Sequence, residues 1–368
     1  MTGGVSENRS ITRLQKVLLA AAGIVLALAV SEVVIRFTDT DMRLLRKTLY
    51  YECAFLPLHR TSVDAERLYE TVPGAILKGV KEVNPKETSY RSMDITINSL
   101  GFRNREFAAA KTKGVFRIII FGGSNTFGAA VGDDDTYPAQ LQKLFDEKYP
   151  GRVEVWNAGI CAYVISQDVA YSREVVKKYD PDMVIFQDTN VGRRAFLYST
   201  TTADIKRLLA KNRELYDENL PPFWQNSPPL AHRVHYVLAR SSALYRTLCV
   251  GVYSWLGTFN RNDPVNPVTD KYSFFWYYYG QSISEREFNL FTGQLQGRRI
   301  ALFYINGDSR QNNMPDITMR DNMTVFSLDP SGRPPEYGEI HPPSYVYRWY
   351  ARELFGFITA GVAAGTAD

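Results

Sequence analysis

Ser124 has the surroundings that a nucleophile requires. It follows Gly122 and Gly123 at the end of an apolar, β-rich run, residues 116–121. The two glycines allow a tight turn and a close approach of the backbone to a ligand. If a helical turn begins at Ser124, its free N–H groups and its dipole favour a negatively charged oxygen. A serine hydroxyl needs a base to attack at neutral pH, so the chemistry requires a partner elsewhere in the chain.

His341 can serve as that base. It stands between the last predicted strand and the last predicted helix, in the stretch Glu-Ile-His-Pro-Pro. Imidazole accepts a proton at physiological pH and can return it to a leaving group. Because the loops that follow parallel strands meet at one edge of a sheet, we expect His341 at the same edge as Ser124. The prediction is that the two side chains come within proton-sharing distance.

Two further residues follow predicted strands and could stabilise an oxyanion. Gly159 closes the strand at residues 153–156, and Asn190 follows the strand at residues 183–186. Both belong to loops at the edge that carries Ser124. The backbone N–H groups of Ser124 and Gly159 and the Asn190 amide could hold the oxyanion together. One such donor lowers a barrier by about 3 kcal/mol.

The elements that position these residues alternate between strand and helix. Strands are predicted at residues 94–98, 116–121, 153–156, 183–186, 299–305 and 324–328, and helices at residues 138–149, 167–179 and 345–358. This alternation predicts a three-layer, doubly wound α/β fold whose parallel sheet is covered on both faces. Ligands bind such sheets at the carboxyl ends of the strands, near the point where the strand order reverses. The alternation pauses at about residues 195–295, which we interpret as an insertion with a helical stretch, 231–256, and an aromatic run, 272–279.

Four short blocks resemble the Ser, Gly, Asn and His blocks of the SGNH/GDSL hydrolase family. They are Phe-Gly-Gly-Ser-Asn-Thr-Phe-Gly at 121–128, Asn-Ala-Gly at 157–159, Gln-Asp-Thr-Asn at 187–190 and His-Pro at 341–342. The segment Asn-Ser-Leu-Gly-Phe-Arg, residues 98–103, is similar to what precedes this domain in membrane-anchored bacterial members. The resemblance covers about residues 95–195 and 298–358. It implies a flavodoxin-like sheet and ester hydrolysis without a cofactor, with Ser124 and His341 catalytic and Ser124, Gly159 and Asn190 forming the oxyanion hole.

The chain departs from the family pattern at two positions that bear on the chemistry. Gly123 replaces the aspartate before the serine, which is not the base in the family. Gly338 stands where the family has the acid that orients the histidine, three residues before His341. Glu339, Glu336 or a backbone carbonyl could orient the imidazole instead, giving a dyad or a displaced triad.

The N-terminal segment is predicted to be a membrane anchor. An uncharged apolar run covers residues 17–30 and continues at residues 33–35, roughly the length that a bilayer core needs. Arg9, Arg13 and Lys16 precede it, so the N-terminus is expected in the cytoplasm and the rest of the chain outside the inner membrane. A cleaved signal peptide, with a small-x-small site at residues 27–29, is the alternative. The expected organisation is a cytoplasmic tip and anchor at 1–36, a stalk and cap at 37–112, the hydrolase domain at 113–360 and a tail at 361–368.

The composition excludes several classes of protein. A hydrophobic content of 45% is typical of a globular chain, and a net charge of +4 without a long basic run gives no basis for nucleic-acid binding. Three scattered cysteines do not form a disulfide framework. His232 and His235 have helical spacing but no acidic third ligand beside them, so a solvated helix face is favoured over a metal site.

The favoured function is that of a serine esterase, and two alternatives stay open. The resemblance implies O-acyl groups of an envelope or secreted polysaccharide as the substrate, and the aromatic insertion leaves lipid esters open. The same chemistry gives O-acyl transfer when a sugar hydroxyl replaces water. A non-catalytic binding module of a polysaccharide assembly system is the other alternative, motivated by Gly338. A nucleotide-binding phosphate loop at Gly122 and Gly123 is disfavoured, because the Lys-Ser/Thr ending is missing. The sequence does not define an oligomeric state.

Overall fold

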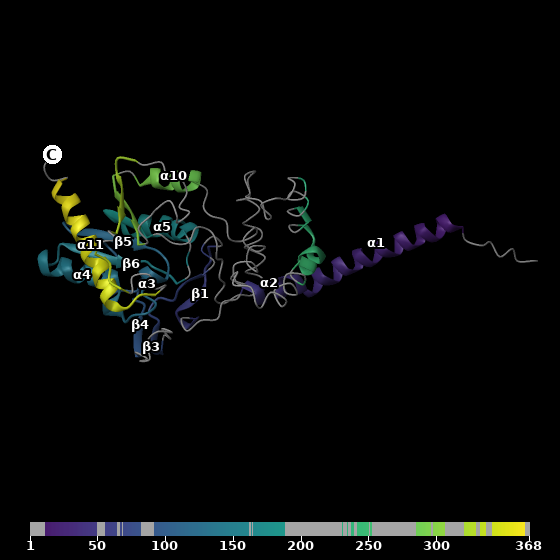
Figure 1. The fold of residues 1–368 in the computed structure, drawn as a ribbon, viewed down its shortest axis with the longest axis horizontal. Coiled ribbons are helices and arrows are strands. Elements are labelled where there is room, and N and C mark those ends of the chain that lie inside the picture. The colour runs from purple at the N-terminus through teal and green to yellow at the C-terminus, as the bar shows by residue number, and fades with distance from the viewer. Residues whose placement is uncertain are drawn as a thin grey trace, which may run out of the picture. The chain divides into compact units, whose positions relative to one another are not determined.

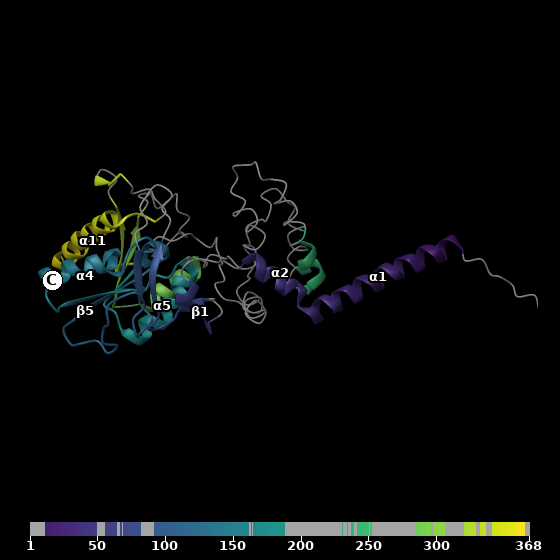
Figure 2. The same ribbon diagram turned by 90° about the horizontal axis from the view of Figure 1, so that it is seen from below.

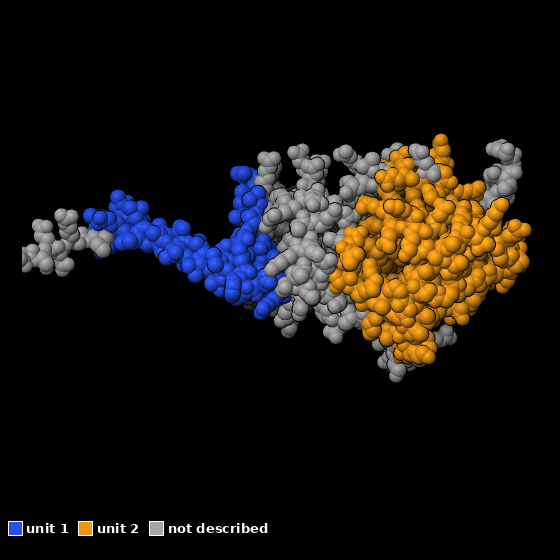
Figure 3. Space-filling model, turned by 180° about the vertical axis from the view of Figure 1, so that it is seen from behind, with its two compact units in different colours: residues 1–48, 221–267 blue, residues 49–220, 268–368 orange. Residues whose placement is uncertain are grey.

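The described residues fall into two compact units. The computed structural model describes residues 12–49, 56–64, 67, 69–81, 92–161, 163, 165–187, 230, 234, 237–238, 241–249, 251, 285–295, 297–305, 320–328, 332–335 and 341–364. Unit 1 comprises residues 1–48 and 221–267, and unit 2 comprises residues 49–220 and 268–368 (Figure 3). Part of the predicted insertion groups with the N-terminal helix in unit 1, and the boundaries expected at residues 36, 112 and 360 stay predictions.

Unit 2 is an α/β structure built on one parallel sheet. Its strands are β5 (Phe116–Phe121), β6 (Val153–Asn157), β7 (Met183–Gln187), β8 (Arg299–Tyr304) and β9 (Met323–Ser327). They lie in the order β6-β5-β7-β8-β9, and every pair is parallel. Read along the chain this is the order 2-1-3-4-5 of flavodoxin-like sheets, in which the strand order reverses between the first and third strands. The predicted strands are confirmed to within a residue or two, and so is the α/β class.

Helices cover both faces of this sheet (Figures 1 and 2). On one face lie α4 (Tyr137–Lys148) and α11 (Ser344–Ala364), and on the other lie α5 (Ile165–Tyr179) and α10 (Glu285–Gln294). Ile118 and Ile120 pack toward α4 and α11, whereas Ile119 and Phe121 pack toward α5. Successive side chains of a strand point to opposite faces, so one continuous apolar run serves both cores. The helix α11 continues past the predicted end at residue 358 to Ala364, so the predicted tail is partly helical.

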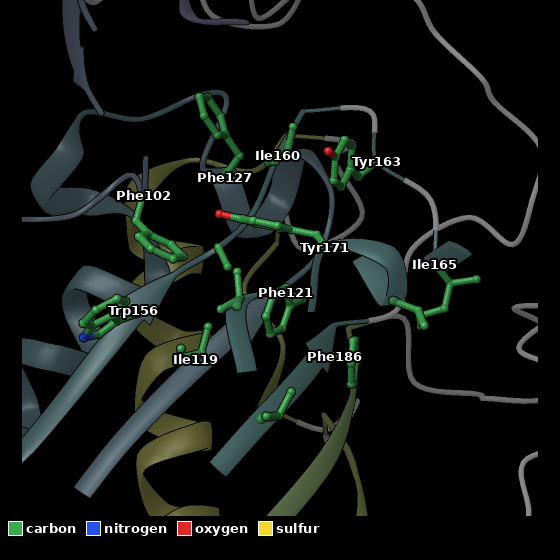
Figure 4. Close-up of a cluster of buried hydrophobic side chains, with 14 of the residues drawn as sticks. Phe102, Ile119, Phe121, Phe127, Trp156, Ile160, Tyr163, Ile165, Tyr171 and Phe186 are labelled. Atoms are coloured by element: carbon green, nitrogen blue, oxygen red, sulfur yellow. The ribbon is translucent and has the colours of Figure 1, made fainter. Parts of the chain in front are cut away.

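Apart from the strand predicted at residues 94–98, the region before β5 contains elements that the sequence did not predict. A 3₁₀ turn, η1 (Leu56–Leu58), precedes an antiparallel pair, β1 (His59–Thr61) with β2 (Tyr69–Thr71). A second antiparallel pair joins β3 (Ile76–Lys81) to β4 (Ser92–Thr96). The chain that follows enters the main core, where Phe102 lies beside Trp156 with ring centroids 5.0 Å apart (Figure 4). Residues 92–107 are therefore part of the core that supports the sheet.

Unit 1 is built around α1 (Arg13–Thr38). Thr12 caps its start and forms a capping box with Gln15. The helix has a mean hydropathy of 2.5 over its most apolar window, and none of its residues is buried. It is long and apolar enough to cross a membrane or to be a signal sequence. The chain bends at Asp39 and continues as α2 (Thr40–Leu49).

Candidate active site

Ser124 is the first residue of α3 (Ser124–Phe127), a single turn of helix directly after β5. The turn is closed by Phe127 N–H donating to Gly123 O at 2.9 Å and by Gly128 N–H donating to Ser124 O at 2.8 Å. The side chain of Ser124 is half-buried. The helical turn at Ser124 is therefore confirmed, and it lies beside the point where the strand order reverses.

A buried hydrogen-bond network fixes α3 from behind. Thr126 Oγ1 donates to Gln187 Oε1 at 2.8 Å and shares a hydrogen bond of 2.8 Å with Tyr137 OH. Gly122 fits tightly between these groups, since a Cβ there would lie 2.9 Å from Gln187 Oε1. The first residue of the predicted Asn block, Gln187, thus contacts the turn that carries Ser124. Asn190 lies outside the described residues.

Gly159 packs directly against α3. A Cβ at this position would lie 2.7 Å from the carbonyl carbon of Thr126 and would also collide with Phe127 N, so no side chain fits. The Gly159 N–H donates to Asn157 Oδ1 at 3.0 Å. The structure therefore brings Gly159 beside the serine turn, but its N–H could hold an oxyanion only by giving up or sharing the Asn157 bond. Its oxyanion role stays a prediction.

Arg103 braces the loop after Ser124, and sequence reasoning missed this role. Its buried guanidinium donates to the carbonyl oxygens of Phe127 at 2.7 Å, Gly128 at 2.5 Å and Val131 at 2.6 Å. It also pairs with Asp133 at 3.0 Å and lies over the Phe127 ring, 4.8 Å from its centroid. Burial lowers the pKa of Arg103, and the Asp133 carboxylate opposes that shift. The planar fork of donors matches the carbonyl oxygens of this irregular stretch of backbone.

The Asn98–Arg103 segment explains how the guanidinium reaches this loop. Asn98 Oδ1 accepts from the N–H groups of Leu100 and Phe102, at 3.0 and 2.9 Å, and so closes a compact turn. Gly101 takes a left-handed conformation, with φ of +92°, which favours glycine. Phe102 then enters the aromatic core and fixes the direction of the next residue (Figure 4). The one available signal was the resemblance of residues 98–103 to the family, which did not reveal what Arg103 contacts.

His341 is half-buried and stands just before α11. The first turn of α11 is joined to α3, because Tyr347 OH donates to Asn125 Oδ1 at 3.3 Å. This bond links the residue after Ser124 to the helix that begins three residues after His341. The two segments therefore meet at one edge of the sheet, whereas direct contact between Ser124 Oγ and the His341 ring stays a prediction. Glu336, Gly338 and Glu339 lie outside the described residues.

A second imidazole lies near α3. His59 is buried in β1, and its ring centroid is 6.2 Å from that of Phe127 and 5.7 Å from that of Tyr69. It was not among the residues predicted from the sequence, and it is a second candidate for the base beside His341.

Within the described ranges, no three His, Cys, Asp or Glu side chains are grouped so that they could hold a metal ion. His232 and His235 are not among the described residues. Comparison of the chain with protein-family models, with curated proteins and with solved structures found no match.

Proposed function

We propose that this protein is a serine hydrolase that cleaves ester bonds, with Ser124 as nucleophile and His341 as base. The observation that carries the proposal is the hydrogen bond between Tyr347 and Asn125, which joins the segments of the two residues at the carboxyl edge of the sheet. The half-buried position of Ser124 at the end of β5 supports it, since ligands bind α/β sheets at this edge.

The proposed reaction has two steps. Ser124 Oγ attacks the acyl carbonyl while His341 takes the hydroxyl proton, and the same proton passes to the leaving alcohol as the ester bond breaks. Water then attacks the acyl-serine while His341 takes one of its protons, and this proton passes to Ser124 Oγ as the acyl–oxygen bond breaks and the free acid leaves. The N–H groups of Ser124 and Gly159 and the Asn190 amide hold the oxyanion in both steps, with Gly159 giving up or sharing its bond to Asn157 Oδ1. Glu336 or Glu339 orients the imidazole.

The proposed location is the outer side of the inner membrane, with α1 as a single anchor. The basic residues before the apolar run support this orientation. The apolar residues that continue beyond the small-x-small site at residues 27–29 favour a retained helix over a cleaved signal peptide. The proposed substrates are O-acyl groups of envelope or secreted polysaccharide, with lipid esters and transfer to a sugar hydroxyl as variants.

Labelling with a fluorophosphonate tests the nucleophile. We expect the wild-type chain to be labelled and Ser124→Ala to lose both labelling and hydrolysis of aryl esters, the latter by roughly 10⁶-fold in kcat. Ser327→Ala is the matched control, because Ser327 is exposed at the same edge of the sheet, at the end of β9. Labelling that survives Ser124→Ala, or a folded wild type that is never labelled, would overturn the proposal. The second result, together with binding of acylated polysaccharide, would favour a binding module.

Two histidine variants test the base. His341→Gln should abolish ester hydrolysis while leaving the chain folded, and His59→Gln should retain it. The opposite result would assign the base to the buried imidazole beside Phe127.

A further inference from the structure

Four apolar side chains that lie close together in the sequence of unit 1 are exposed. Leu230 is 72% exposed, Val234 49%, Val237 57% and Leu238 38%. Their spacing of i, i+4, i+7 and i+8 places them on one face of a helix. A run of apolar residues on one exposed face requires a partner.

The position of this face is set by polar contacts with α1. Glu32 accepts from Ser242 Oγ at 2.8 Å and from the backbone N–H groups of Ala243 at 2.9 Å and Leu244 at 2.8 Å. Arg36 donates to Ser241 O. The N–H groups in the first turn of a helix have no backbone acceptor within the helix. Here the Glu32 carboxylate of α1 accepts from two of them, those of Ala243 and Leu244.

A buried ion pair joins the segment that follows this face to α2. Arg246 pairs with Asp41 at 2.7 Å, and both residues are almost completely buried. These contacts lie within one compact unit and tie residues 241–246, which directly follow the exposed face, to α1 and α2. The described part of residues 230–251, green in Figures 1 and 2, runs across the axis of α1 and not along it.

We propose that Leu230, Val234, Val237 and Leu238 lie in the outer surface of the bilayer that α1 crosses. The apolar stretch of α1 ends at Ile35, and Glu32 lies about 5 Å before that end at 1.5 Å per residue. A segment bonded to Glu32 therefore starts at the level of the outer headgroups. Because it runs across α1, it follows the membrane plane, with its apolar face toward the acyl chains.

The sequence around this face has the polar residues that an interfacial helix requires. On a helical wheel His232 and His235 fall on the side away from the four apolar residues, and Arg233 and Arg240 flank these residues next to Val237. Basic side chains on the polar face favour anionic headgroups. The occupant is thus a lipid surface, and the proposal rests on α1 spanning a membrane but not on the hydrolase chemistry.

Cysteine accessibility in proteoliposomes tests this proposal on the full chain. In a background with Cys53→Ser, Cys161→Ala and Cys249→Ser, single variants Leu238→Cys and Val234→Cys are exposed to a charged, membrane-impermeant maleimide. Val63→Cys is the water-exposed control, since Val63 in unit 2 is 91% exposed. Leu26→Cys is the control for α1. We expect Val63→Cys to react at once and both unit 1 probes to react roughly tenfold more slowly until detergent is added.

Each outcome decides the proposal. Unit 1 probes that react as fast as Val63→Cys would overturn it, as would probes that stay protected in detergent, because protein would then cover the face. If Leu26→Cys reacts without detergent, α1 does not span the bilayer and the proposal falls with it. Fluorophosphonate labelling of the same preparations reports separately on Ser124, so failure of the hydrolase proposal would not be confused with failure of this one.

Discussion

Among the described residues of unit 2, two arginine side chains are completely buried, one near each end of β5. Arg103 pairs with Asp133 and donates to three carbonyl oxygens in the loop after α3. Arg117 pairs with Glu154 at 2.8 Å and donates to the carbonyl oxygens of Ala108, Ala109 and Tyr179. Each guanidinium also lies over an aromatic ring, that of Phe127 for Arg103 and that of Trp156 for Arg117.

The same arrangement, a buried arginine that donates to backbone carbonyl oxygens, serves two purposes in this protein. A buried guanidinium is tolerated only when its donors are satisfied, and irregular backbone offers the carbonyls that satisfy them. At the amino end of β5 this arrangement ties the preceding loop to the end of α5. At the carboxyl end it fixes the turn that carries Ser124. The two arginines therefore have similar roles in stability, but only Arg103 touches the candidate site.

Replacing each arginine by methionine gives the largest expected effect. Arg103→Met and Arg117→Met each remove a buried cation from its ion pair and take away its hydrogen bonds to three carbonyl oxygens. We expect each change to lower the free energy of unfolding by about 3–5 kcal/mol. Urea denaturation of the full chain in detergent measures both values.

Activity separates the two variants. Below the unfolding transition, we expect Arg103→Met to lose kcat for ester hydrolysis and rate of phosphonate labelling, with a smaller change in KM. Arg117→Met should keep both rates. Arg103→Lys should recover stability in part but not the labelling rate, because an ammonium cannot replace the planar fork. Equal loss of kcat in the two methionine variants would show that Arg103 acts on stability alone.

The sheet could be predicted because its signal is local. Residues 116–121 and 183–186 are continuous apolar runs, as strands buried on both faces require, and each ends at a polar or glycine turn. The order of these turns then placed Ser124, Gly159 and the chain before α11 at one edge. The topology of an α/β sheet does this without knowledge of side-chain contacts.

The support of the serine turn could not be predicted because its partners are backbone atoms distant in sequence. Nothing in the residue types at 127, 128 and 131 shows that their carbonyls receive Arg103. The strands β1 and β2 have three residues each, too few for a period to appear. Glu32 in an apolar helix was expected near the headgroups, but its bonds to residues 243 and 244 depend on a bend formed about 210 residues later.

The variant Gly159→Ala tests how tightly the serine turn is packed at the carboxyl end of β5. Gly159→Ala forces the backbone of α3 to move, because the added Cβ meets Thr126 and Phe127, and overpacking of this kind costs about 1–3 kcal/mol. Gly114→Ala is the matched change at the amino end. A Cβ at Gly114 would meet no other atom, but the φ of +83° strains any residue with a side chain and costs about 1–2 kcal/mol of stability. The two variants should lose similar stability, while only Gly159→Ala should slow phosphonate labelling. Normal labelling of Gly159→Ala would mean that the serine turn tolerates displacement.

The smallest expected effect concerns the bond between α11 and α3. Tyr347→Phe removes one partly buried hydrogen bond of 3.3 Å to Asn125, worth about 1 kcal/mol. Tyr149→Phe, at the amino end of β6, removes a hydroxyl from a ring that is 37% exposed and serves as the control. Because Tyr347 makes other contacts, a double-mutant cycle with Asn125→Ala isolates the pair. If this bond holds the histidine segment against the serine turn, the cycle should show coupling in kcat as well as in stability. Coupling in stability alone would mean that α11 positions His341 through its packed core, and that the bond to α3 adds nothing to catalysis.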